Sequence, residues 1–445
     1  MANKRVYLCL AHMSETGEEQ KYIKEAFDTN WVVPLGPNVN GFEADLEGFV
    51  NHNLYDNANL NKKAVALSAG TAAVHLALIA CGVGPGDEVL VQSFTFCASS
   101  HPITYLGATP VFVDSEKETW NMDPEQLEEA IKDRIQETGK KPKAIVPVAL
   151  YGMPYYIDRI MEIANRYDIP VIEDAAEGFG SRYKGQVLGT FGRYGVLSFN
   201  GNKMITTSGG GALVCPDQEA KDKIMWYATQ AREAYPYYQH EAIGYNYRMS
   251  NICAGIGRGQ MTVVDDHIRH HRHIADMYRE AFCNVDGIDF HDEMPNMESN
   301  FWLCTILLDE KLKVKNEELA YAEAVQGAVG GAAGVVHGGG SVHTDCEPNR
   351  NVEAMRIALD KEGIESRPLW KPMHCQPVYR KAEIKNEKLK FKNGEILRQT
   401  SASSIAYING VSEELFKQGL CLPSGPMVTD DDVRRIIKTI KENIG

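Results

Sequence analysis

The sequence predicts an α/β protein with a large domain on a mixed sheet of about seven strands and a smaller C-terminal α/β domain. Short apolar runs alternate along the chain with segments whose apolar residues recur every three or four positions, as in amphipathic helices. This alternation is typical of a parallel or mixed sheet with helices on both faces. The chain of 445 residues is long enough for two substantial cores. The strands expected in the large domain are 64–67, 88–92, 109–113, 143–148, 170–173, 195–199 and 211–214.

Three parts are expected along the chain. Residues 1–40 would form a helix at 16–28 and an extended loop, 41–265 the large domain, and 266–445 a linker helix with the small domain. In the small domain the glycine-rich segment 325–340 predicts a mobile loop. Further helices are expected at 41–50, 124–137 and 155–167, and from Val214 to about 232; the small domain would contain strand 301–308 and helix 351–362.

The composition excludes several functional classes. A net charge of −14 argues against binding to a nucleic-acid backbone, although a local basic site could still hold a phosphorylated small molecule. No apolar run approaches the roughly 20 residues that span a bilayer, and the first residues do not resemble a secretory signal. Ten cysteines without a Cys-x-x-Cys pair favour buried, reduced thiols in a cytoplasmic protein over disulfides or zinc, so no metal site is expected.

The histidine-rich segment 267–273 suggests a metal site, because His267, His270 and His271 could share one face of a helix. The interleaved arginines would repel a cation, however. We therefore expect no metal there, and a solvated basic face instead.

Two polar side chains follow neighbouring apolar strands. Asp174 ends strand 170–173, and Lys203 follows strand 195–199 after a tight Asn-Gly-Asn turn. Ligands of parallel α/β sheets collect outside the carboxyl ends of the strands. Pyridoxal 5'-phosphate (PLP) would need both groups, a lysine amine for its aldehyde and a carboxylate beside its ring nitrogen. The alternative is an Asp that caps a helix and a solvated loop lysine.

Other segments offer groups for the same cofactor. Ser198 could donate to the phosphate, and Gly70 and Thr71 begin an expected helix whose free N–H groups could bind it. Phe96 lies at the carboxyl end of strand 88–92, where its ring could stack on a pyridine. A core phenylalanine is the competing interpretation for this residue.

The amino-acid sequence of these segments resembles that of the DegT/DnrJ/EryC1/StrS family of sugar aminotransferases. The matching strings are Asp174-Ala-Ala-Glu177, Ser198-Phe-Asn-Gly-Asn-Lys203, Thr206-Thr-Ser-Gly-Gly-Gly211 and Gly244-Tyr-Asn-Tyr-Arg-Met249. Many members have Gly-Glu where Ser208 and Gly209 stand, which is a modest departure. The resemblance implies the fold-type I architecture of PLP-dependent transferases, which is that of aspartate aminotransferase.

The resemblance also implies roles for individual residues. Lys203 and Asp174 would be catalytic, and Gly70, Thr71, Phe96, Glu177 and Ser198 would complete the cofactor site. Asn246 would reach the phosphate of the neighbouring subunit, so the active unit would be a homodimer with shared active sites. L-glutamate would donate the amino group to a nucleotide-linked 4-keto-6-deoxy sugar.

The substrate expected from the resemblance is UDP-2-acetamido-4-keto-2,6-dideoxyhexose, aminated at C4, with GDP-4-keto-6-deoxymannose as the runner-up. Arg232, His240, Arg248 and Lys371 lie in segments that could hold the diphosphate. A dehydratase branch has histidine at the lysine position, so Lys203 argues against it. A non-catalytic binding protein on the same fold is the rival of another class.

Overall fold

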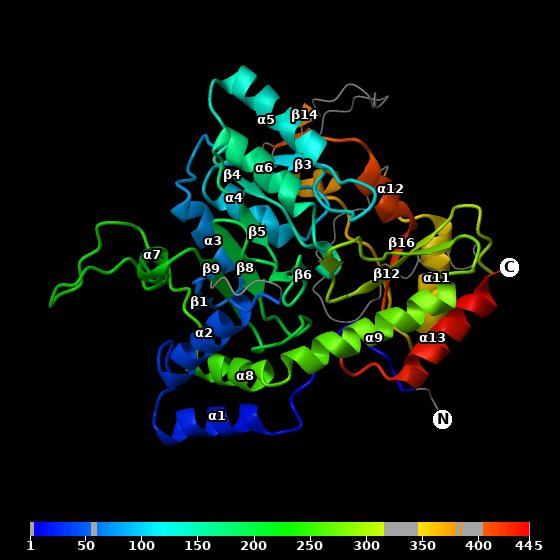
Figure 1. Ribbon diagram of the computed structural model, residues 1–445, viewed down its shortest axis with the longest axis horizontal. Helices are drawn as coiled ribbons and strands as arrows, with labels where there is room; N and C mark the ends of the chain where they lie inside the picture. Colours follow the sequence, from blue (N-terminus) through cyan, green and yellow to red (C-terminus); the bar gives the residue numbers. More distant parts are fainter. Residues whose placement is uncertain (1–3, 55–59, 316–345, 380–382, 385–403, 445) are drawn as a thin grey trace.

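The computed structural model describes residues 4–54, 60–315, 346–379, 383–384 and 404–444, so the glycine-rich segment 325–340 lies outside the described residues. The fold is organised around a large mixed sheet (Figure 1). One part of the sheet has the strand order β1-β9-β8-β5, and the other part has the order β14-β15-β3-β2-β4. Parallel bridges between Ile145 and Val171 and between Val148 and Asp174 join β4 to β5.

Each expected strand of the large domain is present, with ends within two residues of the prediction. Only β9 runs antiparallel to its neighbours β1 and β8, so the predicted mixed sheet is confirmed. The strands are β1 (Lys63–Leu67), β2 (Glu88–Gln92), β3 (Thr109–Val113), β4 (Ala144–Val146), β5 (Ile172–Asp174), β8 (Tyr194–Ser198), β9 (Gly211–Cys215), β14 (Glu383–Ile384) and β15 (Ile405–Tyr407).

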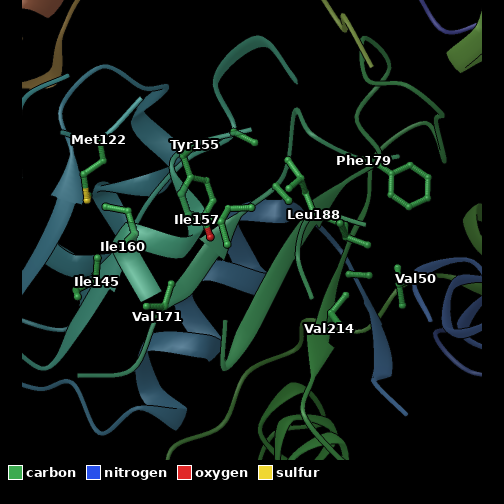
Figure 2. Close-up of a cluster of buried hydrophobic side chains, with 14 of the residues drawn as sticks. Val50, Met122, Ile145, Tyr155, Ile157, Ile160, Val171, Phe179, Leu188 and Val214 are labelled. Atoms are coloured by element: carbon green, nitrogen blue, oxygen red, sulfur yellow. The ribbon is translucent and has the colours of Figure 1, made fainter. Parts of the chain in front are cut away.

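Helices cover both faces of this sheet because successive side chains of each strand point to opposite faces. Ala64 and Ala66 of β1 pack in one buried cluster, while Val65 and Leu67 pack in the other. Figure 2 shows the first cluster, in which Ile160 lies near Val171, the residue before β5. The helices on this face include α2 (Pro37–Val50), α5 (Pro124–Thr138) and α6 (Ile157–Tyr167); α3 (Gly70–Ala80), α4 (His101–Tyr105) and α7 (Gln218–Ala228) cover the other.

Local signals explain where several helices begin and end. Asp123 caps α5 by accepting hydrogen bonds from the backbone N–H groups of Glu125 and Gln126, and Gly139 ends it with a φ of 69°. The helix expected to reach about 232 ends at Ala228, because Gln230 and Ala231 adopt positive φ values of 63° and 51°. That prediction was therefore too long.

The small domain is built on an antiparallel sheet of order β10-β12-β16-β13. The expected strand 301–308 begins only at Cys304, because Phe301 turns the chain with a φ of 47°. The elements are β10 (Ile288–Phe290), β12 (Cys304–Leu308), β13 (Arg367–Pro368) and β16 (Gly419–Leu422), with helices α11 (Arg350–Lys361), α12 (Val411–Gln418) and α13 (Asp430–Asn443).

Helix α9 (Val264–Phe282) runs from α8 (Asn251–Met261) towards α11 and α13 (Figure 1). The N-terminal helix α1 (Glu18–Asp28) packs along α8. β14 and β15 lie beyond position 265 in the chain but belong to the large sheet. The expected division of the chain into three parts stays a prediction. No helix in the described ranges is long and apolar enough to cross a membrane.

The histidines of α9 are not the solvated basic face that the sequence suggested. His267 and His271 are buried, and their Nδ1 atoms lie 3.1 Å and 3.0 Å from the carbonyl oxygens of Met204 and Phe301. Burial lowers the pKa of His271 to about 3, so the ring is neutral at pH 7. The prediction was wrong here because these positions face the domain junction, where a neutral ring can donate to a backbone carbonyl.

Candidate active site

A cavity of about 340 Å³ lies at the carboxyl ends of β5 and β8, beside the first turn of α3. Parallel strands deliver their following residues to the same edge of the sheet, so separate segments meet there. The cavity brings together most of the cofactor residues expected from the sequence: Gly70, Thr71, Phe96, Asp174, Glu177, Ser198 and Lys203. We call Asp174, Glu177, Ser198 and Lys203 the strand-end wall.

Asp174 is a buried carboxylate held in a fixed orientation. The hydroxyl of Ser99 donates to its Oδ2 at 2.5 Å, and the backbone N–H of Ala176 donates to its Oδ1 at 3.2 Å. Burial raises the pKa of Asp174, because a low-dielectric surrounding disfavours the charged form, and Lys203 opposes this shift. A cation held against this carboxylate would therefore stabilise its ionised form.

Lys203 lies between a carboxylate and an aromatic ring. Its Nζ is 3.5 Å from Oε1 of Glu177 and 3.9 Å from the centre of the Trp302 ring. Burial raises the pKa of Glu177, and Lys203 together with a hydrogen bond from the backbone N–H of Tyr151 lowers it in part. The amine is thus held inside the cavity by an ion pair and a cation–π contact.

The start of α3 forms the part of the cavity that suits an anion. Ala69 precedes the helix without a side-chain cap, so the first N–H groups of α3 have no side-chain acceptor. A side chain at Gly211 would come within 2.4 Å of the backbone N of Gly70, so only glycine lets this strand approach the helix start. Thr71 and Ser198 add hydroxyl groups to the same cavity.

The chemical groups of this cavity match those that PLP requires. The uncapped N-terminus of α3 suits a phosphate, Asp174 suits a protonated ring nitrogen, and Lys203 offers an amine to an aldehyde. Phe96 is half exposed and lines the cavity, which suits stacking better than the competing role of a core phenylalanine.

Two tryptophans, Trp302 and Trp370, also line the cavity, and we call them the tryptophan wall. The indole N–H of Trp302 donates to the carbonyl of Asn202 at 2.5 Å. The backbone N–H of Trp370 donates to the hydroxyl of Tyr151 at 2.7 Å, and its ring lies 5.5 Å from that of Phe96.

The sequence did not single out Trp302, because the apolar run 301–308 predicts a strand with Trp302 inside it. The position of Trp302 depends on long-range contacts of Asn300, which the local sequence does not reveal. The side-chain amide of Asn300 donates to the carbonyls of Glu177 and Phe179, both at 2.9 Å, and this bends the chain before β12. Trp370, in contrast, directly precedes Lys371, which was expected to hold the diphosphate.

The other predicted residues do not line this cavity. Asn246, Arg232 and His240 belong to segment 229–246, the arm, which projects from the body beside α7 (Figure 1). The guanidinium of Arg232 lies 4.3 Å from the centre of the Tyr238 ring, and Nδ1 of His240 lies 2.9 Å from the carbonyl of Gln230. Within the described residues of one chain, the arm folds on itself rather than on the site.

Two further basic residues lie nearer to the cavity. Lys371 lines a neighbouring cavity of about 650 Å³ that shares Asn202, Trp302 and Trp370 with the first. Arg248 forms a bridge with Leu67, the last residue of β1, and its Nε is buried without a hydrogen-bond partner among the described residues. Only Lys371 of the expected substrate cations therefore faces a space that adjoins the cavity.

The fold and the site together define a PLP-dependent transferase of fold type I. The DegT/DnrJ/EryC1/StrS aminotransferase family model matches residues 13–332, so the chain belongs to this family. It is 42% identical over 438 residues to EpsN of Bacillus subtilis, described as a pyridoxal phosphate-dependent aminotransferase, covering 98% of this chain and 95% of that protein. It is 34% identical to GDP-perosamine synthase of Escherichia coli O157:H7, covering 98% of each.

Solved structures agree with this assignment. A DegT DnrJ EryC1 StrS aminotransferase from Brucella abortus superimposes with a TM-score of 0.76 at 26% identity, over 96% of this chain and 95% of that one. The PLP form of Spr1654 from Streptococcus pneumoniae gives 0.75 at 23% identity, over 99% and 98%, which supports the fold alone. The predicted fold and the PLP cofactor are thus confirmed, and the protein is a sugar aminotransferase of this family.

Proposed function

We propose that this enzyme transfers an amino group from L-glutamate to C4 of a nucleotide-linked 4-keto-6-deoxy sugar. The observation that carries the proposal is the placement of Asp174 and Lys203 in one cavity, beside the uncapped start of α3. Bound PLP would supply an electron sink for the electrons released at the substrate carbon.

The residues around PLP would then have separate roles in proton transfer and in cofactor binding. Lys203 would be the base that takes a proton from the donor's α-carbon and the acid that returns it, since its amine lines the cavity. Asp174 keeps a proton on the ring nitrogen through its buried charge. The first turn of α3, with Thr71 and Ser198, binds the phosphate.

We propose UDP-2-acetamido-4-keto-2,6-dideoxyhexose as the sugar substrate, because segments 30–37 and 198–211 resemble those of family members that make UDP-linked 4-amino sugars. A relative from Pseudomonas aeruginosa, 36% identical over 245 residues, is a UDP-2-acetamido-2-deoxy-3-oxo-D-glucuronate aminotransferase, which supports a UDP-linked acetamido sugar. GDP-4-keto-6-deoxymannose is the second candidate, because GDP-perosamine synthases from three bacteria are 31–34% identical.

One comparison of rates separates these candidates. Purified enzyme with L-glutamate should give a higher kcat/KM for the UDP sugar than for the GDP sugar, and the product should carry its new amine on C4 by NMR. A higher value for the GDP sugar would reverse the choice of nucleotide. Turnover of neither sugar, in a preparation that still removes the amino group from L-glutamate, would reject both sugars but not the chemistry.

We also propose that the enzyme acts as a homodimer in the cytoplasm. The arm carries exposed apolar side chains, of which Tyr237, Tyr238 and Ile243 are 61%, 78% and 83% exposed in one chain. Asn246 is exposed at the base of the arm and bridges to Thr229, so it does not line the cavity of its own chain. All ten cysteines lie in the described ranges and none forms a disulfide, which supports a reducing compartment.

Mixing two inactive variants tests the shared site. Lys203→Ala and Asn246→Asp should each be inactive alone, the second because a carboxylate would repel the partner's phosphate. Subunit exchange should restore activity, since one of the two sites in a mixed dimer would have both native residues. A mixture that stays inactive although light scattering shows dimers would contradict the role of Asn246, and a fully active monomer would contradict the dimer.

A further inference from the structure

A cluster of two thiols and a carboxylate lies outside the cofactor cavity. The sulfur atoms of Cys346 and Cys375 and a carboxylate oxygen of Glu413 all lie within 4.8 Å of one another. We call these three residues the thiol cluster. Cys346 is buried and the other two are partly buried, so their ligand atoms are largely shielded from solvent.

The carboxylate of this cluster is held by a second layer of buried groups. Nε2 of His374 lies 3.3 Å from Oε1 of Glu413, and Nδ1 of His374 lies 2.6 Å from the hydroxyl of Ser93. The side chains of His374 and Glu413 are only 4% and 13% exposed. Ligand carboxylates of metal sites are typically oriented by outer hydrogen bonds of this kind.

We propose that Cys346, Cys375 and Glu413 bind a zinc ion, with water as the fourth ligand. A tetrahedral zinc separates its sulfur and oxygen ligands by roughly 3.5–3.8 Å, given Zn–S near 2.3 Å and Zn–O near 2.1 Å. The observed spread of at most 4.8 Å therefore needs only small rotations of side chains. On binding, both thiols lose their protons to solvent and the carboxylate is already ionised, so the zinc and its three protein ligands together carry a single negative charge.

The ligand types select the metal. Two thiolates disfavour Mg²⁺ and Ca²⁺, which prefer oxygen ligands, and favour thiophilic zinc. Among the described residues, this is the only group of three or more His, Cys, Asp or Glu side chains with such spacing. The histidines of α9, which the sequence suggested first, bond to backbone carbonyls instead.

Zinc here would join three segments that are separate in the chain. Cys346 precedes α11, Cys375 ends the short 3₁₀ turn Met373–Cys375, and Glu413 lies in α12. That 3₁₀ turn follows Trp370 closely in sequence, so the metal would fix the backbone that carries one half of the tryptophan wall. This effect would not depend on which sugar the enzyme uses.

The first test uses the unmodified holoenzyme. Protein purified with a thiol reductant and without chelators should contain about one zinc per chain by plasma mass spectrometry. Zinc should protect Cys346 and Cys375 from alkylation, while the exposed Cys283 reacts with or without it. Equal alkylation of Cys346 and Cys375 with and without added zinc would overturn the proposal, as would a Cys346–Cys375 disulfide as the native state.

Variants give the second test. Cys346→Ser and Cys375→Ser should lose zinc and the thiolate-to-metal absorption of the cobalt-substituted protein, while Cys283→Ser keeps both. His374→Ala should weaken zinc binding by about 10–100-fold, as expected for an outer hydrogen-bond partner. If the Cys346→Ser and Cys375→Ser proteins bind zinc as tightly as the native chain, the site is elsewhere and the proposal fails. Activity is not needed for any of these measurements, so failure of the sugar assignment would not affect them.

Discussion

The strand-end wall and the tryptophan wall line one cavity and meet where Lys203 contacts Trp302, yet the chain assembles them in different ways. Asp174, Glu177, Ser198 and Lys203 come from one stretch of sequence and two neighbouring parallel strands. Trp302 and Trp370 come from the small domain and reach the cavity through hydrogen bonds to Asn202 and Tyr151. The first wall is local in sequence, and the second depends on how two domains meet.

The walls also differ in charge. Burial raises the pKa values of Asp174 and Glu177, so the strand-end wall holds charged groups in a surrounding that disfavours their ionised forms. The tryptophan wall contributes neutral rings. We propose that the strand-end wall carries out the chemistry and that the tryptophan wall positions its groups, so changes to the strand-end wall should lower activity far more.

The largest effect is expected for Lys203→Ala. Loss of the amine removes both the covalent hold on the cofactor aldehyde and the proton carrier, so kcat should fall by at least about a thousandfold. Borohydride reduction followed by peptide mapping should place the cofactor on Lys203 in the native chain. The exposed Lys223→Ala is the matched control and should keep full activity; a cofactor label on another lysine would contradict the assignment.

A smaller but still large loss is expected for Asp174→Asn. The amide cannot hold a proton on the ring nitrogen by charge, so the barrier should rise by about 3 kcal/mol, or roughly a hundredfold in rate. Single-turnover kinetics with L-glutamate alone would measure this step without the sugar. Near-normal rates in this variant, with a native far-ultraviolet circular dichroism spectrum, would argue against the role of Asp174.

The tryptophan wall should respond more mildly. Trp302→Phe loses the hydrogen bond to Asn202 and weakens the cation–π contact with Lys203, together about 1–2 kcal/mol, so kcat should fall roughly tenfold. Trp370→Phe is the matched comparison, because its indole nitrogen is buried without a hydrogen-bond partner among the described residues. If Trp370→Phe lowers kcat more than Trp302→Phe does, the ring of Trp302 does not position the lysine.

The smallest effect concerns the stability of the cofactor-free protein. In the folded protein the pKa of Asp174 lies above its ordinary value of 3.8. At pH values between the unfolded-state and folded-state pKa, the folded state therefore binds more protons than the unfolded state. Unfolding free energy should therefore fall as pH rises through that window, and the loss remains at neutral pH. Asp174→Asn should raise this free energy at pH 7, because the amide has no charge to bury.

Urea unfolding of the cofactor-free protein at several pH values measures this effect. Asp168→Asn is a control of opposite sign, because a hydrogen-bonded ion pair with Lys141 at 2.6 Å lowers the pKa of Asp168. Loss of this ion pair in Asp168→Asn should leave the free energy of unfolding unchanged or reduce it at neutral pH. A cofactor-free Asp174→Asn protein less stable than the native chain at pH 7 would contradict the unfavourable burial of this carboxylate.

Sequence patterns predicted the strand-end wall because its parts depend on short-range features. The strand before Asp174 and the turn before Lys203 are each readable within a few residues, and parallel pairing then brings the strand ends together. The same reasoning placed Gly70 and Thr71 at a helix start. These elements follow from local periodicity and turn chemistry, which a sequence expresses directly.

The tryptophan wall and the α9 histidines could not be predicted in the same way. Trp302 faces the cavity because Asn300 is bonded to carbonyls more than a hundred residues away, which no local pattern encodes. His267 and His271 look solvated in sequence but lie where α9 crosses other elements. Asn246 and the arm are proposed to contact a second subunit. The pattern of a single chain can indicate that they are exposed, but not what they contact.

The return of β15 to the large sheet has a consequence for how the chain folds during synthesis. Ile405 pairs with Val111, and Tyr407 with Val113, so β3 meets this neighbour only after nearly the whole chain has left the ribosome. Until then the edge of β3 has unpaired backbone groups, which are open to mispairing with other chains. Contacts of such long sequence separation also fold slowly. The large sheet of the nascent enzyme would therefore keep an open edge at β3 until β15, one of the last strands to be made, has been synthesised.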